Sequence, residues 1–307
     1  MNPELLVNPF HIQHMEQLCK KGADAFLVGT AGIGIHLPAF FSIEEIQKAC
    51  EIKEKYHKKL YIAINGIYHN DQLETLENYL HLLKEFSIDG VTFGDPAILM
   101  LHQKINASFP LHWSPETTAT NWFSCNYWGR KGAIRAVLAP ELSLDAIMEI
   151  KKRAKVEIQV QVHGMLNMFH SKRLLLDHYY QYQGKTEMFL SQYQDRMYLL
   201  DRERGANYPI YQDELGTYML SPKDLCMIDD LDMLFDAKID AFFLNFMFQS
   251  EAYATEITGL YREAIDLLAE DYDAYAQKRN EFLNQVKKIQ PRERELDQGF
   301  FYKETVY

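Results

Sequence analysis

Short runs of β-like sequence alternate with helical patterns along most of this chain, and this alternation limits the folds that it can adopt. The runs ELLVNPF, DAFLVGT and KLYIAING are each followed by a segment with helical apolar spacing, and the pattern occurs eight times within residues 1–270. Parallel strands need helical crossovers, so the alternation predicts a parallel sheet covered by helices. We expect a (β/α)8 TIM-type barrel, with a doubly wound open sheet as the alternative because the sequence does not show closure.

Several of the expected helices begin with recognisable capping residues. Ser42 and Glu45 have the spacing of a capping box at the start of a helical segment. Asp95 precedes Pro96, which suits the first turn of a helix, so we expect Asp95 to cap that helix. Ser143 is expected to cap the helix after the sixth strand. These helix starts predict that the polar residues at the strand ends lie in the loops that connect each strand to the next helix.

The alternation breaks after the seventh strand. Residues 165–215 are rich in Tyr and Gln and have little regular apolar spacing, so we expect a long loop insertion there. Regular spacing returns at Ser221 and Pro222, which have the pattern of a helix cap and a first-turn proline, and the helix predicted from them carries Cys226. After the eighth strand and helix, residues 271–307 are expected to form a C-terminal helix and a tail.

Composition argues against several classes of protein. No apolar run approaches the roughly 20 residues needed to span a bilayer, and the first residues lack the pattern of a secretory signal, so neither a membrane nor a secreted protein is expected. The four cysteines are far apart and form no CxxC pair, which favours the reducing cytoplasm. The formal net charge is −11, whereas nucleic-acid binders usually present a basic face, so the chain is not expected to bind RNA unaided.

Polar residues at the ends of the expected strands are the candidates for a functional site. In barrels and in open α/β sheets alike, the chemistry takes place at the C-terminal ends of the strands. His163 directly follows a buried strand, so we expect its side chain to face the barrel mouth. Glu141 precedes the helix cap Ser143 and is suited to act as a general base or to brace a neighbouring loop. The strand-end candidates are Asn8, Asn65, Asp95, His112, Glu116, Glu141, His163 and Asn245.

No standard catalytic or metal-binding motif is present. The sequence contains no HExxH, GxSxG, P-loop or GxGxxG pattern. The spacing of His163, His170 and His178 fits neither a helical metal-binding pair nor the loops of zinc sites, so no metal site is expected. Cys226 has no neighbouring cysteine and is expected to be a small core residue, unless folding brings it to His163 as a nucleophile–base pair.

Segments spread along the chain carry a family resemblance. They include GADAFLVG, FSIEEI, INGIYHNDQL, GDPAIL, VQVHGMLN and SEAYATEITGLYREAID, in this order. The ordered set resembles the U32 family, whose members are often called collagenase-like peptidases, and it extends from about residue 4 to residue 303. The resemblance also implies a barrel. Within the family, the chain is most similar to the shorter of two related proteins that occur together in Gram-positive bacteria and take part in tRNA hydroxylation.

The resemblance implies either proteolysis or hydroxylation chemistry. Some family members support the prephenate-dependent 5-hydroxylation of the wobble uridine of tRNA, and the hydroxylating members hold a [4Fe–4S] cluster through four cysteines. This chain matches only Cys226 of the four, because Asn167 and Leu174 stand at two of the positions and the stretch FLSQYQDRMYLL has no counterpart of the remaining one. One thiolate cannot hold a cluster that takes four, so we expect this chain to bind no cofactor.

One strand end that is charged in the family has become apolar here. The family's Glu and Arg are replaced by Asn245 and Met247, and its two Lys are replaced by Phe243 and Gln249. Apolar patches often mark partner surfaces. The resemblance and this patch together imply a subunit that works with a longer, cluster-containing U32 relative and meets tRNA only through that complex.

Two other functions stay open from the sequence. One is a U32-type peptidase, for which the candidate catalytic residues are Glu141, His163 and Cys226. The other is a barrel that binds a small acid such as prephenate without activity of its own. The expected ligand-binding residues are Asn65, Asn121, His163 and Arg173.

Overall fold

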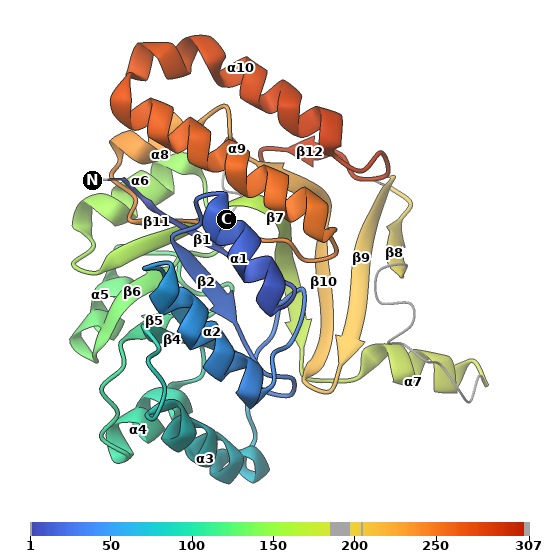
Figure 1. The fold of residues 1–307 in the computed structure, drawn as a ribbon. Coiled ribbons are helices and arrows are strands. Elements are labelled where there is room, and N and C mark those ends of the chain that lie inside the picture. Colours follow the sequence, from blue (N-terminus) through green and yellow to red (C-terminus); the bar gives the residue numbers. More distant parts are fainter. Residues whose placement is uncertain (1, 185–196, 204, 304–307) are drawn as a thin grey trace.

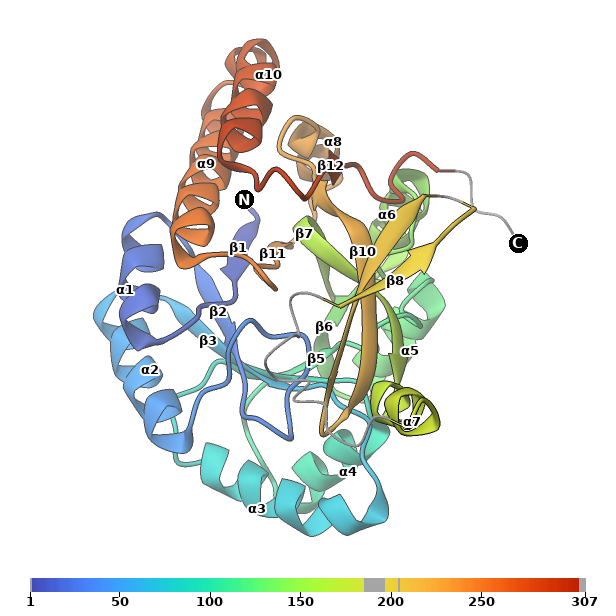
Figure 2. The same cartoon turned by 90° about the vertical axis from the view of Figure 1, so that its right-hand side faces the viewer.

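Eight parallel strands close into a barrel in the part of the chain that the computed structural model describes, residues 2–184, 197–203 and 205–303. The barrel strands are β1 (Glu4–Val7), β2 (Ala25–Val28), β3 (Lys59–Ile64), β4 (Gly90–Phe93), β5 (Leu111–Trp113), β6 (Ala133–Val137), β7 (Glu157–Ser171) and β11 (Ala241–Leu244). Neighbouring strands pair in chain order, and β11 pairs with both β7 and β1 (Figure 2). This closure confirms the (β/α)8 barrel and excludes the open sheet.

Helices surround the barrel, and several begin where the sequence predicts. The Ser42 backbone donates a hydrogen bond to the Glu45 carboxylate at 2.8 Å, and the reciprocal bond completes the capping box. Asp95 accepts a hydrogen bond from the Ala97 backbone at 2.9 Å, and Ser143 caps the helix that follows it. None of the described helices combines the length and the apolar character needed to cross a membrane. The helices that follow barrel strands are α1 (Ile12–Lys20), α2 (Ile43–Lys55), α3 (Leu73–Leu83), α4 (Pro96–Lys104), α5 (Trp122–Arg130), α6 (Leu144–Arg153) and α9 (Glu251–Glu270).

The interior of the barrel is filled by side chains below its mouth. Successive side chains of a strand point to opposite faces, so each strand contributes to an outer core against the helices and to the barrel interior. Tyr61 and Ala63 belong to the interior apolar cluster. At the N-terminal end of the barrel, the buried guanidinium of Arg135 donates to Glu4 at 2.6 Å. His112 is also buried at this level, with its ring 4.6 Å from that of Tyr61. The expectation that His112 lies at the barrel mouth is therefore wrong.

The insertion after the seventh strand is an antiparallel extension of the barrel sheet. β7 continues beyond the barrel and pairs with β10 (Gly216–Cys226), β10 pairs with β9 (Ala206–Asp213), and β9 pairs with β8 (Tyr198–Asp201). These strands stand side by side away from the barrel, and α7 (Leu175–Tyr182) lies beyond their lower end (Figure 1). The irregular loop expected over 165–215 is therefore replaced by strands and the helix α7 in the described part of this segment. Residues 185–196 lie outside the described residues.

The segment after Ser221 is also a strand, although Ser221 and Pro222 have the pattern of a helix start. The register between β7 and β10 shifts between Leu220 and Asp224, so the intervening residues bulge out of the ladder. Proline is tolerated at a bulge because no ladder hydrogen bond is required of it. The next helix, α8 (Leu231–Asp236), begins only after β10 has ended. The predicted helix at Ser221 is wrong, and Cys226 lies on a strand.

The C-terminal part of the chain packs back onto the extension. α10 (Tyr272–Ile289) forms the helix expected after residue 270 and lies along α9 (Figure 1). β12 (Leu296–Asp297) pairs in parallel with β10. Between them, Arg294 forms an ion pair with the buried carboxylate of Asp224 and donates to the Phe248 carbonyl at 2.9 Å. Residues 304–307 of the expected tail lie outside the described residues.

Candidate functional site

The C-terminal ends of the barrel strands enclose a cavity of about 100 Å³. It adjoins an outer hollow of about 390 Å³, and the two share Asn65, Ser114 and Glu116 in their walls. Leu27, Val137 and Phe243 contribute apolar surface to the inner cavity. The polar residues that line it are His36, Asn65, Thr92, Ser114, Glu116, Gln159, Gln161, Asn167 and Asn245.

Glu116, which follows β5, is the main charged residue of the cavity. Its carboxylate accepts hydrogen bonds from the Asn167 amide at 2.7 Å and from Nδ1 of His170 at 2.8 Å, and Nε2 of His36 lies 3.4 Å away. Burial by itself would raise the pKa of Glu116, but the hydrogen bonds and positive charge of the two histidines outweigh it and lower this pKa to about 2. Glu116 is therefore ionised at neutral pH.

A set of aromatic rings connects Glu116 to the extension. Burial lowers the pKa of His170, but the hydrogen bond and charge of Glu116 outweigh it, so the net shift is upward. The ring of His170 stacks on Tyr218 at 4.5 Å, and Tyr218 stacks on Tyr211 at 4.6 Å. The Tyr211 hydroxyl is 2.9 Å from Nδ1 of His36, in the loop after β2. The strand ends and the extension therefore form one connected site.

The family resemblance places Asn167 at the position of a cluster cysteine, and the side chain of Asn167 has a defined orientation. An ionised carboxylate only accepts hydrogen bonds, so the amide nitrogen of Asn167 must face Glu116. Its amide oxygen then points away from Glu116. This oxygen is buried and has no hydrogen-bond partner among the described residues.

The cysteines of the chain do not fit a four-cysteine iron–sulfur site. Cys226 is buried on β10, while Asn167 and Leu174 offer no thiolate at the matching positions. The remaining cysteines are buried on three separate helices. No group of three or more His, Cys, Asp or Glu side chains in the described residues is arranged to hold a metal ion. These other cysteines are Cys19 on α1, Cys50 on α2 and Cys125 on α5.

His163 faces the surrounding helices and not the barrel mouth. The register between β7 and β11 shifts between Gln161 and His163, which leaves Val162 as an extra residue in β7. Since side chains alternate along a strand, one extra residue reverses the face on which the next side chain lies. Nε2 of His163 is 2.8 Å from the hydroxyl of Tyr253 on α9. Burial, followed by the positive charge of Arg294, lowers the pKa of His163 to about 3, so the ring is neutral.

Cys226 and His163 are direct neighbours on β10 and β7, but they do not form an activated pair. Burial raises the pKa of the Cys226 thiol to about 12 and is the main cause of the low pKa of His163. The second nitrogen of His163, Nδ1, lies 3.3 Å from the hydroxyl of Tyr261. A cysteine nucleophile needs an accessible thiolate beside a base. This buried thiol does not meet that requirement.

The other sequence candidates do not converge on one site. Asn65 lines the cavity. Asn121 is exposed and caps α5, and Glu141 is exposed in the turn before α6. Arg173 is exposed just before α7 and does not line the cavity. The structure therefore does not bring Asn65, His163 and Arg173 together around a small acid.

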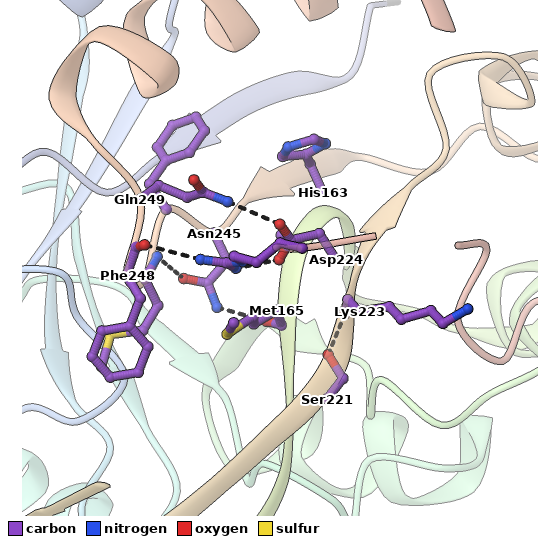
Figure 3. Close-up of polar contacts among 12 residues, drawn as sticks. His163, Met165, Ser221, Lys223, Asp224, Asn245, Phe248 and Gln249 are labelled. Carbon is purple, nitrogen blue, oxygen red and sulfur yellow. Dashed lines mark hydrogen bonds and ion pairs between the residues drawn. The ribbon is translucent and has the colours of Figure 1, made fainter. Parts of the chain in front are cut away.

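Asn8 and Asn245 tie the ends of β1 and β11 together. Asn8 donates to the Asn245 side chain at 3.1 Å and accepts from the Phe246 backbone at 2.9 Å. Asn245 also donates to the Met165 carbonyl at 3.0 Å (Figure 3). Both side chains thus have partners that hold the barrel rim.

The apolar strand end expected to meet a partner is covered by the chain itself. Met247 is buried in a cluster with side chains of β7, β9 and β10, and Phe248 packs against this cluster. Gln249 points to Asp224 and donates to its carboxylate at 2.9 Å (Figure 3). Phe243 is turned into the cavity. The prediction of a partner surface at this strand end is therefore corrected, because the extension covers it.

Most residues that line the cavity are not among the strand-end candidates, because they precede the strand ends or lie in loops. Thr92 lies within β4, and Gln159 and Gln161 lie within β7. The one sequence signal is the alternation in EIQVQVHG, where a glutamine occupies every second position of an otherwise apolar strand. Such alternation indicates a polar inner face. His36 lies within the loop after β2 and has no comparable signal.

Comparison with known proteins identifies the family. A family model described as peptidase family U32 matches residues 11–306. The chain belongs to this family. It is 48% identical to tRNA hydroxylation protein P2 of Bacillus subtilis (strain 168) over 306 residues, which cover 99% of each chain. It is 29% identical to tRNA hydroxylation protein P1 of the same strain over 271 residues, which cover 88% of this chain and 64% of P1.

A solved U32 structure has the same fold. The structure of a U32 peptidase matches with a TM-score of 0.50 and 13% identity, covering 79% of this chain and 92% of the other. At this identity the likeness concerns the fold alone. It agrees with the closed barrel described above.

Proposed function

We propose that this U32 protein takes part in the prephenate-dependent 5-hydroxylation of the wobble uridine of tRNA. In this proposal it is a subunit without an iron–sulfur cluster and works with a longer, cluster-containing relative. The observation that carries the proposal is the 48% identity to tRNA hydroxylation protein P2 over 99% of both chains. The same B. subtilis strain contains P1, of which this chain covers only 64%. P1 and P2 are U32 proteins of different length that are both named for tRNA hydroxylation. This supports the proposal that two unlike subunits share the process.

The site chemistry supports a subunit more than an independent enzyme. The thiols do not fit the family cluster, and Cys226 with His163 does not fit a peptidase. The formal net charge of −11 disfavours tRNA binding by this chain alone. In the proposal, the longer relative therefore supplies the cluster and most contacts to tRNA.

β8 is the surface that we propose for the partner. It lies at the edge of the extension and pairs with β9 in the described part of the chain. Its residues Leu199 and Leu200 are 51% and 57% exposed. Exposed apolar side chains are suited to contact with another protein. This surface takes the place of the covered strand end at Met247.

Nucleoside analysis of tRNA tests the proposed process. Deleting the gene for this chain, or the gene for the longer relative, should reduce nucleosides derived from 5-hydroxyuridine at the wobble position. The wild-type gene on a plasmid should restore them. Unchanged levels in both single deletions and in the double deletion would contradict the proposal.

Co-purification tests the proposed partner and its surface. The tagged chain should retain the longer relative, and Leu200→Glu should weaken this retention because it places a charge on β8. Met100→Glu is the matched control, since Met100 is 68% exposed on α4, away from β8. Separate elution of the two wild-type proteins would count against a complex, and equal loss with both variants would count against β8.

A further inference from the structure

A surface on α5 combines exposed aromatic rings with basic side chains. Phe123 and Tyr127 are 61% and 44% exposed and four residues apart, so they lie on one face of this helix. Arg130 lies over both rings, with its guanidinium carbon 6.0 Å and 5.9 Å from the two ring centres. Nζ of Lys131 is 5.8 Å from the ring centre of Tyr127. These four residues form one continuous surface.

The end of α6 adds further basic residues to this surface. Arg153 lies over the ring of Trp122 at 5.4 Å, and the ring centres of Trp122 and Phe123 are 5.7 Å apart. The side chain of Asn126 fixes the arrangement, because it donates to the Arg153 carbonyl at 3.0 Å and accepts from the Lys155 backbone at 2.7 Å. The α5–α6 patch, as we call this set, consists of Trp122, Phe123, Tyr127, Arg130, Lys131, Lys152, Arg153 and Lys155.

The α5–α6 patch is strongly positive, although the chain as a whole has a formal net charge of −11. Residues 117–140 contain no Asp or Glu, and neither do residues 150–156. Arg153 pairs with Glu149 at 2.6 Å. Basic residues at the ends of α5 and α6 stabilise the helix dipoles, but this does not account for the exposed rings beside them. The exposed cations of the patch without an ion-pair partner among the described residues are Arg130, Lys131, Lys152 and Lys155.

Aromatic rings combined with arginine are typical of the centre of a protein interface. Both kinds of residue are enriched at such centres, and a few of them supply most of the binding energy. The rings of Phe123 and Tyr127 hold the guanidinium of Arg130 in place before binding, so less conformational entropy is lost when it meets a carboxylate. The α5–α6 patch is therefore complementary to a surface that carries carboxylates together with apolar side chains.

Nucleic acid fits the α5–α6 patch less well than protein does. Bases stack on open aromatic faces, whereas the rings of Trp122, Phe123 and Tyr127 each have a cation over one face. A long polyanion would also extend over the rest of a chain that has 43 acidic and 32 basic residues. A short acidic segment is not repelled in this way, because charges more than about 10 Å away are largely screened at 0.1 M salt.

We propose that the α5–α6 patch binds an acidic segment of another protein, in which carboxylates alternate with apolar side chains. The carboxylates would meet the unpaired cations, and the apolar side chains would pack against Phe123 and Tyr127. The patch lies on helices that cover the barrel, whereas β8 belongs to the extension, so this contact is separate from the one proposed for the longer relative (Figure 2). It does not depend on a role in tRNA hydroxylation.

Binding of synthetic peptides to the purified chain tests the proposal. The probe is a short fluorescein-labelled peptide in which leucine and phenylalanine are spaced among glutamates. Its controls are the same peptide with glutamine in place of glutamate, and an oligouridylate of equal length. In fluorescence anisotropy the acidic peptide should bind at least about tenfold more tightly than either control, because several exposed ion pairs each contribute a little. Its affinity should fall as the salt concentration rises.

Substitutions within the α5–α6 patch locate the contact. Arg130→Glu places a like charge against the peptide and should weaken its binding at least about tenfold. Phe123→Ser removes apolar contact area and should weaken the binding about fivefold. Lys48→Glu, at an exposed position on α2, changes the net charge as Arg130→Glu does and is the control, with an affinity within about twofold of wild type. The three side chains are exposed, so the Tm of each variant should stay close to that of wild type.

Three results would overturn the proposal. The first is an acidic peptide that binds no more tightly than the glutamine peptide. The second is equal weakening in Arg130→Glu and Lys48→Glu, which would show that only the net charge matters. The third is an oligouridylate that binds more tightly than the acidic peptide and loses this affinity in Arg130→Glu, which would assign the patch to nucleic acid. Because the assay uses the purified chain and synthetic probes, its outcome is separate from those of the deletion strains and of co-purification.

Discussion

The carboxylate of Glu116 lies 2.8 Å from Nδ1 of His170, and this contact joins the end of β5 to the extension of β7. Glu116 has a positive φ of 59°, a left-handed conformation that costs a non-glycine residue about 1–2 kcal/mol. The hydrogen bonds to its carboxylate offset this cost. Glu116 is thus both a wall of the cavity and the link between the barrel rim and the extension.

Replacing Glu116 should change the ionisation of His170. In Glu116→Gln the negative charge beside His170 is lost while its burial remains, so the pKa of His170 should fall from its raised value. An NMR titration of the histidine ring protons measures this pKa. His178, exposed on α7, serves as the internal control. A pKa of His170 that stays raised in the variant would show that Glu116 is not its cause.

Gly164 should be intolerant of any side chain. It has φ of 90°, and a Cβ at this position would lie 1.8 Å from the carbonyl oxygen of Asn245. We expect Gly164→Ala to lower the free energy of unfolding by at least about 3 kcal/mol, because β7 and β11 must move apart. Gly132→Ala is the control, since Gly132 has φ of 115° but a Cβ added there would meet no described atom within 4 Å. Urea unfolding measures both, and equal losses would contradict the close-approach argument.

The ion pair of Asp224 and Arg294 should be costly to break from one side. Arg294→Met leaves the fully buried Asp224 carboxylate without its cation, and we expect a loss of about 3–5 kcal/mol in the free energy of unfolding. Adding Asp224→Asn should recover part of this loss. Lys104→Met, which breaks an exposed pair with Glu77, should cost less than about 1 kcal/mol. If the double variant Arg294→Met/Asp224→Asn is no more stable than Arg294→Met alone, the unpaired charge of Asp224 is not the cause of the loss.

His163 should make the protein less stable in mild acid. Its pKa is about 3 in the folded state and about 6.5 when unfolded, so between these pH values only the unfolded state binds the proton. Stability from this residue is complete above about pH 6.5 and falls by about 1.4 kcal/mol per pH unit as the pH decreases toward 3.

The variant His163→Gln tests this pH dependence. It should reduce the slope of the unfolding free energy against pH by one proton, measured by urea unfolding between about pH 4 and 6.5. Buried His112, whose pKa is also about 3, leaves part of the slope in place. Identical slopes in the wild type and the variant would rule out His163 as a contributor.

The barrel could be predicted from the sequence because local signals and tertiary packing agree there. The barrel strands are apolar, and the helices have apolar residues at helical spacing. The helix caps Ser42 and Asp95 form as expected. The extension could not be predicted, because its strands are half-exposed and lack a simple apolar pattern. At Ser221 and Pro222, a local helix signal is overridden by a β-bulge that only the pairing of β7 with β10 creates.

The candidate site was less predictable than the fold. Asn65 and Glu116, two of the polar residues expected at the C-terminal ends of the strands, line the cavity. His163 was expected on the same face, but its side chain lies on the opposite face of the sheet. The extra residue Val162 causes this reversal, and a bulge depends on pairing with β11, which has no local signature. The contact of Glu116 with His170 joins residues far apart in sequence, so no spacing argument could reveal it.

The tail around Arg294 has a consequence for how the protein is made. Residues 290–297 supply Gln290 and Arg294 to Asp224 and the strand that pairs with β10. They leave the ribosome after all eight barrel strands. A nascent chain at that stage carries an Asp224 carboxylate without its cation and an unpaired strand edge, and unpaired strand edges are features that chaperones and aggregating neighbours engage. We expect the last step of native folding to wait until translation has passed this segment.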